Sequence, residues 1–347
     1  MSSNTSSPII QKISDNNEQY ILEELLNINY NIDKLIQTLL NNNKSKRYEK
    51  VENIIYNKYK ISKITELKEH INLNYKNCNN DNCSYTIIEE FFNCLFNVFV
   101  SENKNKLDFN AVNSDNKTLL MQSIFNKNAF YTEELIINGA NVNKKGSNGW
   151  TPLLQAVVLI NTEDIIKLLL SNGSDIFHVN NNNQNCLHMI AGKDRVENLS
   201  VILEYINSEL IYENLKNSNN NIILEINTKL LNLKDHIGMT PFVKSCASGS
   251  FYFANHLLNS KYIKNNCVKF DENICIDINS QDKEGNTALH YCFEFGNEEF
   301  ISKLIEKEIK PIKNNKNQYC FELTDNNIIK EKFLDYIKKT KSDNNIK

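Results

Sequence analysis

A helix-capping residue followed by leucine recurs in this chain at a nearly constant interval. Thr118, Thr151 and Asn185 are spaced 33 and 34 residues apart, and each has a leucine within the next two residues. Threonine and asparagine side chains cap helix N-termini by accepting a backbone N–H bond. Self-similarity at such a period is typical of stacked repeats, in which each unit contacts only its neighbours. The spacing therefore predicts a repeat protein with one helix beginning after each cap.

The clearest unit runs from Gly149 to Gly173. Thr151 is predicted to cap a helix whose first residue is Pro152, a position where proline leaves no amide donor missing. A second helix is predicted over residues 163–171, and Gly173 can adopt the left-handed conformation that ends it. The unit is thus predicted to be helix, turn, helix and glycine stop, followed by a polar hairpin.

This unit resembles an ankyrin repeat through G-x-T-P-L at its front, from Gly149, and L-L-L-x-x-G at its back, ending at Gly173. The segment from Gly139 to Asn143 is similar to the G-A-D-V-N of that family. The resemblance implies an all-α fold, an ankyrin-repeat solenoid of helix-turn-helix units and hairpins, behind a helical N-terminal region. It covers roughly two thirds of the chain.

Two later anchors, Thr240 and Thr287, follow at intervals of 55 and 47 residues, which predicts inserts near 207–232 and 260–277. Tyr319 begins a degenerate sixth anchor. We expect a disordered N-terminus over 1–15, a helical region over 16–104, about five repeats over 105–340 and a disordered tail over 341–347. Whether residues 16–104 form a helical cap or degenerate repeats stays open.

Apolar residues in the first third recur at helical spacing. They predict two helices within 16–40 with a break near 27–31, further helices over 48–59 and 61–71, a polar loop over 72–82 and an apolar helix over 85–100.

The charge is nearly balanced, at net −3 with a pI of about 6.1, so no large field draws the chain to nucleic acid or a membrane. The basic C-terminal stretch that begins at Lys303 is offset by glutamates around Glu298 and Glu306. Nine cysteines lack disulfide-type spacing and indicate reduced thiols. With no signal-peptide or membrane-spanning segment, we expect a cytoplasmic or nuclear monomer. Roughly 60 asparagines make the chain Asn-rich, mostly in runs between apolar segments.

No residue pattern points to catalysis. The candidate zinc ligands His70, Cys78, Cys83 and Cys94 lack C-x-x-C spacing, and phosphate-binding glycine loops are missing. The resemblance implies that His188 and His290, at the fourth position of the T-P-L-H box, bond to backbone near the hairpin and orient adjacent repeats. We expect a non-enzymatic chain with no catalytic, cofactor-binding or metal-binding residues and no cofactor.

The resemblance also implies an adaptor or scaffold that binds a protein partner through its concave face. Carried over by register, the partner-contacting residues include Trp150, Val158, Leu159, Phe125, Met239, Gln184 and Lys193. Trp150 is the strongest candidate because tryptophan is enriched at the energetic centres of interfaces. The alternative for this side chain is packing against its own hairpin or the first insert.

Two other functions stay open. The segment from Asn185 to Ala191, between a regular repeat and a long insert, resembles the ankyrin region of fungal cell-cycle transcription factors, which implies a regulatory subunit of a transcription complex. An enzyme with its activity in the N-terminal helical region is the third possibility. The family's hairpin hydroxylation is a further hypothesis for Asn143, where Leu135 has the required spacing but Asn141 replaces the preferred acid.

Overall fold

The structure, a computed structural model, describes residues 18–41, 48–76, 83–206, 225–259, 264–265, 275–307 and 309–344. The chain divides into two compact units, Met1–Lys144 and Lys145–Lys347, and each is described by itself. In the part of the chain so described, no helix has the length and apolar character to cross a membrane.

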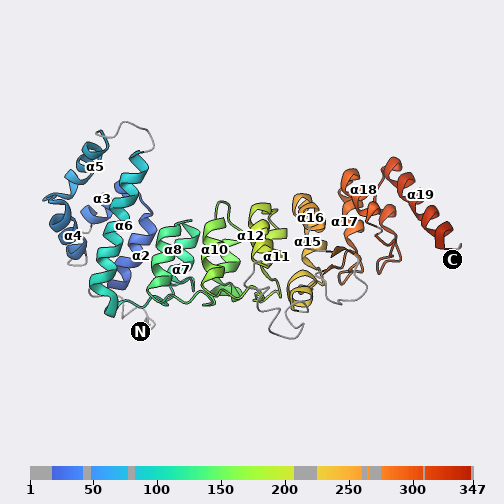
Figure 1. Ribbon diagram of the computed structural model, residues 1–347, viewed down its shortest axis with the longest axis horizontal. Coiled ribbons are helices and arrows are strands. Elements are labelled where there is room, and N and C mark those ends of the chain that lie inside the picture. The colour runs from blue at the N-terminus through green and yellow to red at the C-terminus, as the bar shows by residue number, and fades with distance from the viewer. Residues whose placement is uncertain are drawn as a thin grey trace, which may run out of the picture. The chain divides into compact units, whose positions relative to one another are not determined.

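In its described residues the first unit consists of helices joined by turns and loops, with an isolated β-bridge between Val112 and Thr118. Its elements are α2 (Glu18–Ile28), α3 (Ile32–Asn41), α4 (Glu49–Tyr59), η2 (Ile64–Glu66), α5 (Leu67–Lys76), α6 (Cys83–Asn103), η3 (Lys104–Lys106), α7 (Leu119–Phe125) and α8 (Ala129–Ile137) (Figure 1).

The predicted break between the first two helices is confirmed, because Asn29 and Tyr30 take positive φ angles of 45° and 63°. One prediction in this region is wrong. The helix expected over 61–71 starts as a 3-10 turn at Ile64 and continues to Lys76, into the predicted loop. Asn72 is exposed, so its polarity marks the solvent side of a helix and not the helix end.

Aromatic side chains contribute to a core of the first unit that is otherwise largely aliphatic. Phe96 of α6 stacks on Tyr131 of α8 with ring centroids 4.4 Å apart, and Tyr30 packs against both Tyr131 and Phe92 at 5.5 and 5.8 Å. The helix α2 packs on α7, and α6 packs on α8. The pair α2 and α6 therefore covers the α7–α8 pair, with α3, α4 and α5 inserted between them in sequence.

The second unit repeats a helix pair. Its elements are η4 (Ser147–Gly149), α9 (Pro152–Ala156), α10 (Glu163–Ser171), α11 (Cys186–Ala191), α12 (Val196–Ile206), the π-type helix η5 (Ile226–Leu231), α15 (Pro241–Ala247), α16 (Phe251–Leu258), β1 (Lys264–Asn265), β2 (Cys275–Ile276), α17 (Ala288–Glu294), α18 (Glu298–Glu306), η6 (Cys320–Leu323) and α19 (Asn327–Asn344). The pairs follow one another in chain order (Figure 1).

Each first helix begins at its predicted cap. The Oγ1 atoms of Thr151 and Thr240 accept bonds from the amides three residues on, both at 3.3 Å, and Asn185 Oδ1 accepts from the amide of His188 at 3.1 Å. Gly173 ends the α10 segment with φ of +83°. The predicted helix-turn-helix unit is confirmed residue by residue over 151–173.

Successive first helices stack, with α11 against α15 and α15 against α17, while α12 packs on α10 and α16. The contacts are made by buried apolar side chains such as Leu187, Phe242 and Leu289. At the C-terminal end, Phe333 of α19 is fully buried and its ring centroid lies 5.2 Å from that of Phe293. The helix α19 thus covers apolar surface of the repeat formed by α17 and α18.

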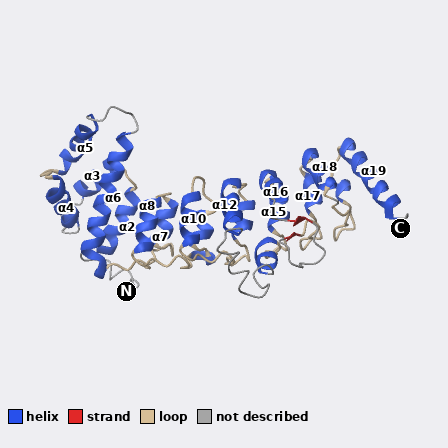
Figure 2. Cartoon of the chain, viewed as in Figure 1, coloured by secondary structure: helices blue, strands red, loops and turns tan. Residues whose placement is uncertain are grey.

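Most of both predicted inserts lies outside the described residues. The described ends are η5 and a two-residue parallel pairing of β1 with β2, red in Figure 2. Asn232 joins them: its Nδ2 donates to the Cys275 oxygen at 2.9 Å, and its Oδ1 accepts from the Asp277 amide at 2.8 Å. The two inserts therefore approach each other at their C-terminal ends.

The expectation of reduced cysteines is confirmed at five described positions and wrong at one. Cys94, Cys186, Cys246, Cys292 and Cys320 are free thiols, whereas Cys275 is disulfide-bonded. Burial raises the pKa of both Cys186 and Cys320 to about 12, so these thiols stay protonated and serve as small apolar side chains.

Candidate functional site

Backbone hydrogen bonds connect the hairpins of the second unit into a ladder. Each bond joins the second residue of one hairpin, through its N–H, to the third residue of the preceding hairpin, through its carbonyl. The bonds run from Asn181 to Asn148 at 3.0 Å, His236 to Asn182 at 3.0 Å, Lys283 to Ile237 at 3.1 Å and Asn315 to Glu284 at 2.9 Å. The hairpin tips from 147 to 317 are thereby held in one row.

A buried side chain shapes most of these hairpins from within. Five residues before every cap except Thr151 lies an Asn or Asp whose Oδ1 accepts two backbone amides of the same hairpin. Asp235 accepts from Ile237 and Met239, both at 3.0 Å. The same arrangement occurs at the buried Asn180, Asp282 and Asn314, and at the half-buried Asn113 of the first unit.

Gly146 is the exception to this pattern. It holds the same register before Thr151 but has no side chain, and its hairpin is closed by the Gly146 amide on the Trp150 oxygen at 2.8 Å. The hairpin that carries the tryptophan therefore lacks the side-chain bracket of the others.

Glycine is required where neighbouring hairpins touch most closely. Gly285 has φ of +79°, and a Cβ atom there would lie 2.6 Å from the Asn315 amide nitrogen. Gly238 has φ of +84°, and its Cβ would lie 2.7 Å from the Lys283 nitrogen. Both distances are below van der Waals contact, so the ladder depends on these glycines for space as well as for conformation.

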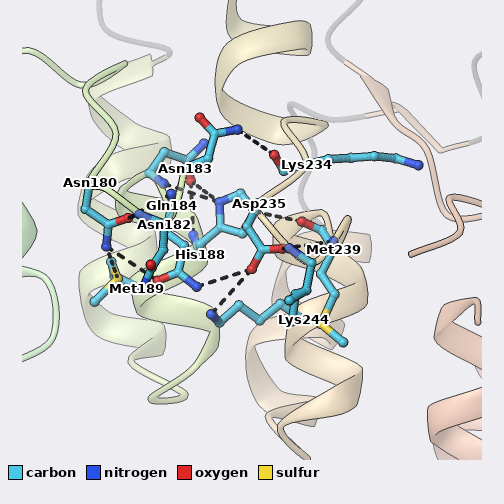
Figure 3. A network of polar contacts seen from close by, with 12 residues as sticks. Asn180, Asn182, Asn183, Gln184, His188, Met189, Lys234, Asp235, Met239 and Lys244 are labelled. Carbon is cyan, nitrogen blue, oxygen red and sulfur yellow. Dashed lines mark hydrogen bonds and ion pairs between the residues drawn. The ribbon is translucent and has the colours of Figure 1, made fainter. Parts of the chain in front are cut away.

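A polar network joins the hairpin that ends at Asn185 to the hairpin that ends at Thr240 (Figure 3). Gln184 Nε2 donates to Asp235 Oδ2 at 3.2 Å, and Lys244 Nζ lies 3.8 Å from the same oxygen. The Asp235 side chain is fully buried. Partial burial lowers the pKa of Lys244, against the opposing attraction of Asp235. The buried carboxylate is thus satisfied by both hairpins and by α15.

His188 extends the network from α11. Its Nε2 lies 2.9 Å from the Met239 oxygen, and its Nδ1 lies 3.4 Å from the Asn185 amide nitrogen. Since a carbonyl can only accept, Nε2 carries the proton. Burial lowers the pKa of His188 to about 4, so the ring is neutral at pH 7.

His290 makes the corresponding contact in the following repeat, with Nε2 3.2 Å from the Gln318 oxygen, and burial lowers its pKa as well. The prediction that both histidines bond to backbone at the hairpins and link adjacent repeats is confirmed.

The four residues weighed as zinc ligands are described only in part. His70 and Cys94 lie on α5 and α6, whereas Cys78 and the side chain of Cys83 lie outside the described part of the chain. Within the described ranges, no group of three or more His, Cys, Asp or Glu side chains could hold a metal ion.

The predicted contact residues differ in exposure. Phe125, in the first unit, is 56% exposed and lies under the Lys117 ammonium at 5.4 Å from the ring centroid. In the second unit Lys193 is exposed, whereas Trp150, Val158, Leu159, Gln184 and Met239 are half-buried.

Neighbouring repeats engage the main chain or side chain of four of these residues. The carbonyls of Val158 and Leu159 accept from Arg195 Nε and Asn198 Nδ2, at 3.3 and 2.8 Å. Gln184 and Met239 are brought together through Asp235 and His188. These four residues, which the register assigns to contact with a partner, therefore also make contacts between neighbouring repeats.

Sequence reasoning missed exposed apolar side chains of the second unit, among them Ile160 and Ile237, which are 47% and 42% exposed. Ile237 lies at a hairpin tip, three residues before its cap, whereas the positions assigned by register are the residue directly before each cap and the seventh and eighth residues after it. Phe295, at one of these assigned positions, is 54% exposed. Sequence reasoning also missed the Asn or Asp side chain that accepts two amides within most of the hairpins. An Asn or Asp five residues before nearly every cap was a detectable signal for it.

Comparison with known proteins agrees with this geometry. A family model described as ankyrin repeats (3 copies) matches residues 78–180 and 216–317, more than half of the chain. Among curated proteins, none matches the chain. A solved structure similar to it is the ankyrin repeat domain of Bcl-3, described as a unique member of the IkappaB protein family. The TM-score is 0.52 at 15% identity, over 69% of this chain and 92% of that one, and this likeness concerns the fold alone. The chain belongs to the ankyrin-repeat family.

Proposed function

We propose that the chain is a non-catalytic adaptor or scaffold that binds a protein partner through the hairpin tips and the exposed sides of the first helices in its second unit. Ankyrin repeats generally serve as protein-interaction modules. The single observation that carries the proposal is the hairpin ladder, which fixes a row of side chains before any partner arrives. A surface held rigid in advance loses little conformational entropy on binding.

The side chains along this row favour a partner surface that is partly apolar. Ile237 is exposed at a hairpin tip. Trp150 is half-buried in the hairpin that begins at Gly146 and has no Asn or Asp side chain to accept its backbone amides. Lys193 adds one exposed cation near the end of α11. Apolar side chains that a repeat stack leaves in solvent are typical of interaction sites.

We also propose a domain organisation for the chain. Residues 105–340 carry the repeats, and residues 16–104 form a helical cap, because α2 and α6 cover the α7–α8 pair as a preceding repeat would. The flanking segments 1–15 and 341–347 carry no assigned role. A cytoplasmic or nuclear monomer, the absence of nucleic-acid and membrane partners, hydroxylation of Asn143 and the role in a transcription complex all stay predictions.

Quantitative affinity purification of the full chain and three variants tests the proposed function. Ile237→Asp and Lys193→Glu alter exposed side chains, and Trp150→Ala truncates the half-buried ring. Lys167→Glu, on the exposed side of α10, is the matched charge-reversal control. We expect a shared set of partners to be depleted by the three surface variants and retained by the control. Partners retained equally by all four variants would contradict the proposal.

A further inference from the structure

A groove of about 260 Å³ lies between α16 and α18, the second helices of two successive repeats. Phe300 is buried at this groove, and its ring centroid lies 5.3 Å from that of the half-buried Phe251. Tyr252 borders the groove and is 77% exposed. Among the large apolar side chains that are exposed in the described part of the chain, Tyr252 has the highest exposed fraction.

The groove has an acidic border. Asp194 and Glu299 line it together with Lys303, and an adjoining hollow along α18 adds Glu298 and Glu306. Counting also Lys332, which pairs with Glu298, the carboxylates exceed the ammonium groups by two. The rim therefore attracts a cation.

Glu299 is a carboxylate that lies open to a ligand. Its side chain is 81% exposed, and one oxygen lies 2.7 Å from Lys303 Nζ. That hydrogen bond lowers the pKa of Glu299, so the group is ionised near neutral pH. A carboxylate has about four acceptor positions, and one bond to an ammonium leaves room for further donors.

The dimensions restrict the class of ligand. Pockets for small molecules and cofactors span roughly 300–1,000 Å³, so this groove suits a single side chain. An aromatic face beside carboxylates favours a guanidinium group, which stacks on a ring and donates several bonds at its edge. A lysine ammonium is a more strongly hydrated point charge and fits this combination less well.

We propose that the α16–α18 groove binds an arginine side chain from an extended segment of a protein partner. The guanidinium stacks on Tyr252 and pairs with Glu299, and the aliphatic stem lies along Phe251. This surface consists of second helices and the turns before them, and it is separate from the hairpin row of the proposed function.

Binding of labelled peptides to the full chain tests the assignment. The probes are fluorescein-labelled Gly-Ser-Arg-Leu-Arg-Ser-Gly and the same peptide with lysine in place of both arginines, compared by fluorescence anisotropy. We expect saturable binding of the arginine peptide, weaker binding of the lysine peptide, and a loss of affinity as salt rises. Tyr252→Ala and Glu299→Lys should each weaken arginine-peptide binding about tenfold.

Two further variants sharpen the test. Asp164→Lys reverses the charge at the second residue of α10, the register that Glu299 occupies in α18, and should leave binding unchanged. Lys303→Gln removes the competing cation and should strengthen it. Equal affinity for both peptides, or the same loss from Asp164→Lys as from Glu299→Lys, would overturn the proposal in favour of unspecific charge attraction. Absence of saturable binding by the wild-type chain would overturn it as well.

Discussion

The Nε2 atom of His188 lies 2.9 Å from the backbone oxygen of Met239, fifty-one residues away in the sequence. The ring belongs to the first helix of one repeat and the oxygen to the hairpin of the next. The ring is fully buried, and Met239 is half-buried. One side chain therefore spans the interface between repeats on either side of a long insert, and it orients the hairpin on which Ile237 is displayed.

Replacing His188 should loosen that interface. His188→Ala leaves the Met239 oxygen without its donor and opens a cavity, so we expect a loss of about 3 kcal/mol in the free energy of unfolding. His236→Ala is the matched control, because its side chain is exposed and its ladder bond is made by the backbone. Chemical denaturation of both variants measures the difference. Equal, small losses would show that the ring contributes little.

The stability of the chain should depend on pH through the same ring. An unfolded histidine has a pKa near 6.5, whereas burial lowers that of folded His188 to about 4. Between these values the unfolded chain binds more protons, so stability falls as pH drops from about 6.5 towards 4. His188→Gln removes this contribution. The stability difference between wild type and variant should be constant above pH 7 and shift against the wild type below pH 6, whereas a difference independent of pH would contradict the assignment.

Gly285 and Gly173 allow the cost of a steric clash to be distinguished from the cost of a positive φ angle. Both have positive φ, but a Cβ at Gly285 would collide with Asn315, whereas nothing lies within 4 Å of one at Gly173. Gly173→Ala should cost about 1 kcal/mol for the backbone conformation alone. Gly285→Ala should cost about 3 kcal/mol because the hairpins must also move apart.

Hydrogen exchange at the Asn315 amide, which donates to the Glu284 oxygen, reports this movement directly. We expect faster exchange in Gly285→Ala than in Gly173→Ala. Identical exchange in the two variants would mean that the ladder does not need the close approach.

Asp235 should tolerate loss of its charge better than loss of its oxygen. Asparagine holds the same register at Asn180 and Asn314 and accepts the same two amides. Asp235→Asn should therefore cost no more than about 1 kcal/mol, whereas Asp235→Ala leaves buried donors unpaired and should cost about 3 kcal/mol. Thermal unfolding of the two variants measures these losses of stability. If Asp235→Asn loses as much stability as Asp235→Ala, the ion pair with Lys244 is the dominant contact.

Local backbone chemistry explains which parts of the fold could be predicted. Helix capping and termination involve only the neighbouring turn of the chain. The roles of Thr151, Pro152 and Gly173 therefore follow from residue type and spacing. The sequence predicts a helix that ends at residue 71, whereas the helix continues to Lys76, because the solvent-facing Asn72 looks like a loop residue in the sequence.

The candidate surface was harder to predict because contacts between repeats decide it. Register predicts that Gln184 contacts a partner, yet its side-chain amide donates to Asp235, which lies beyond the first insert in the sequence. Exposure of Tyr252 depends on how α18 lies beside α16, and no pattern within α16 reports that. Trp150 was chosen for its residue type, and its half-buried position is compatible with a contact that a partner completes.

Site-specific photo-cross-linking tests the central claim most directly. A photoreactive phenylalanine analogue is placed singly at Ile237 and Lys193 on the proposed surface, and at Lys167 and Asp164 on α10, all in the full-length chain. All four side chains are exposed, so each variant should fold. We predict covalent adducts with a partner protein from Ile237 and Lys193 and none from the two α10 positions. Adducts from α10 alone, or in equal yield from all four positions, would contradict binding through the hairpins and first helices.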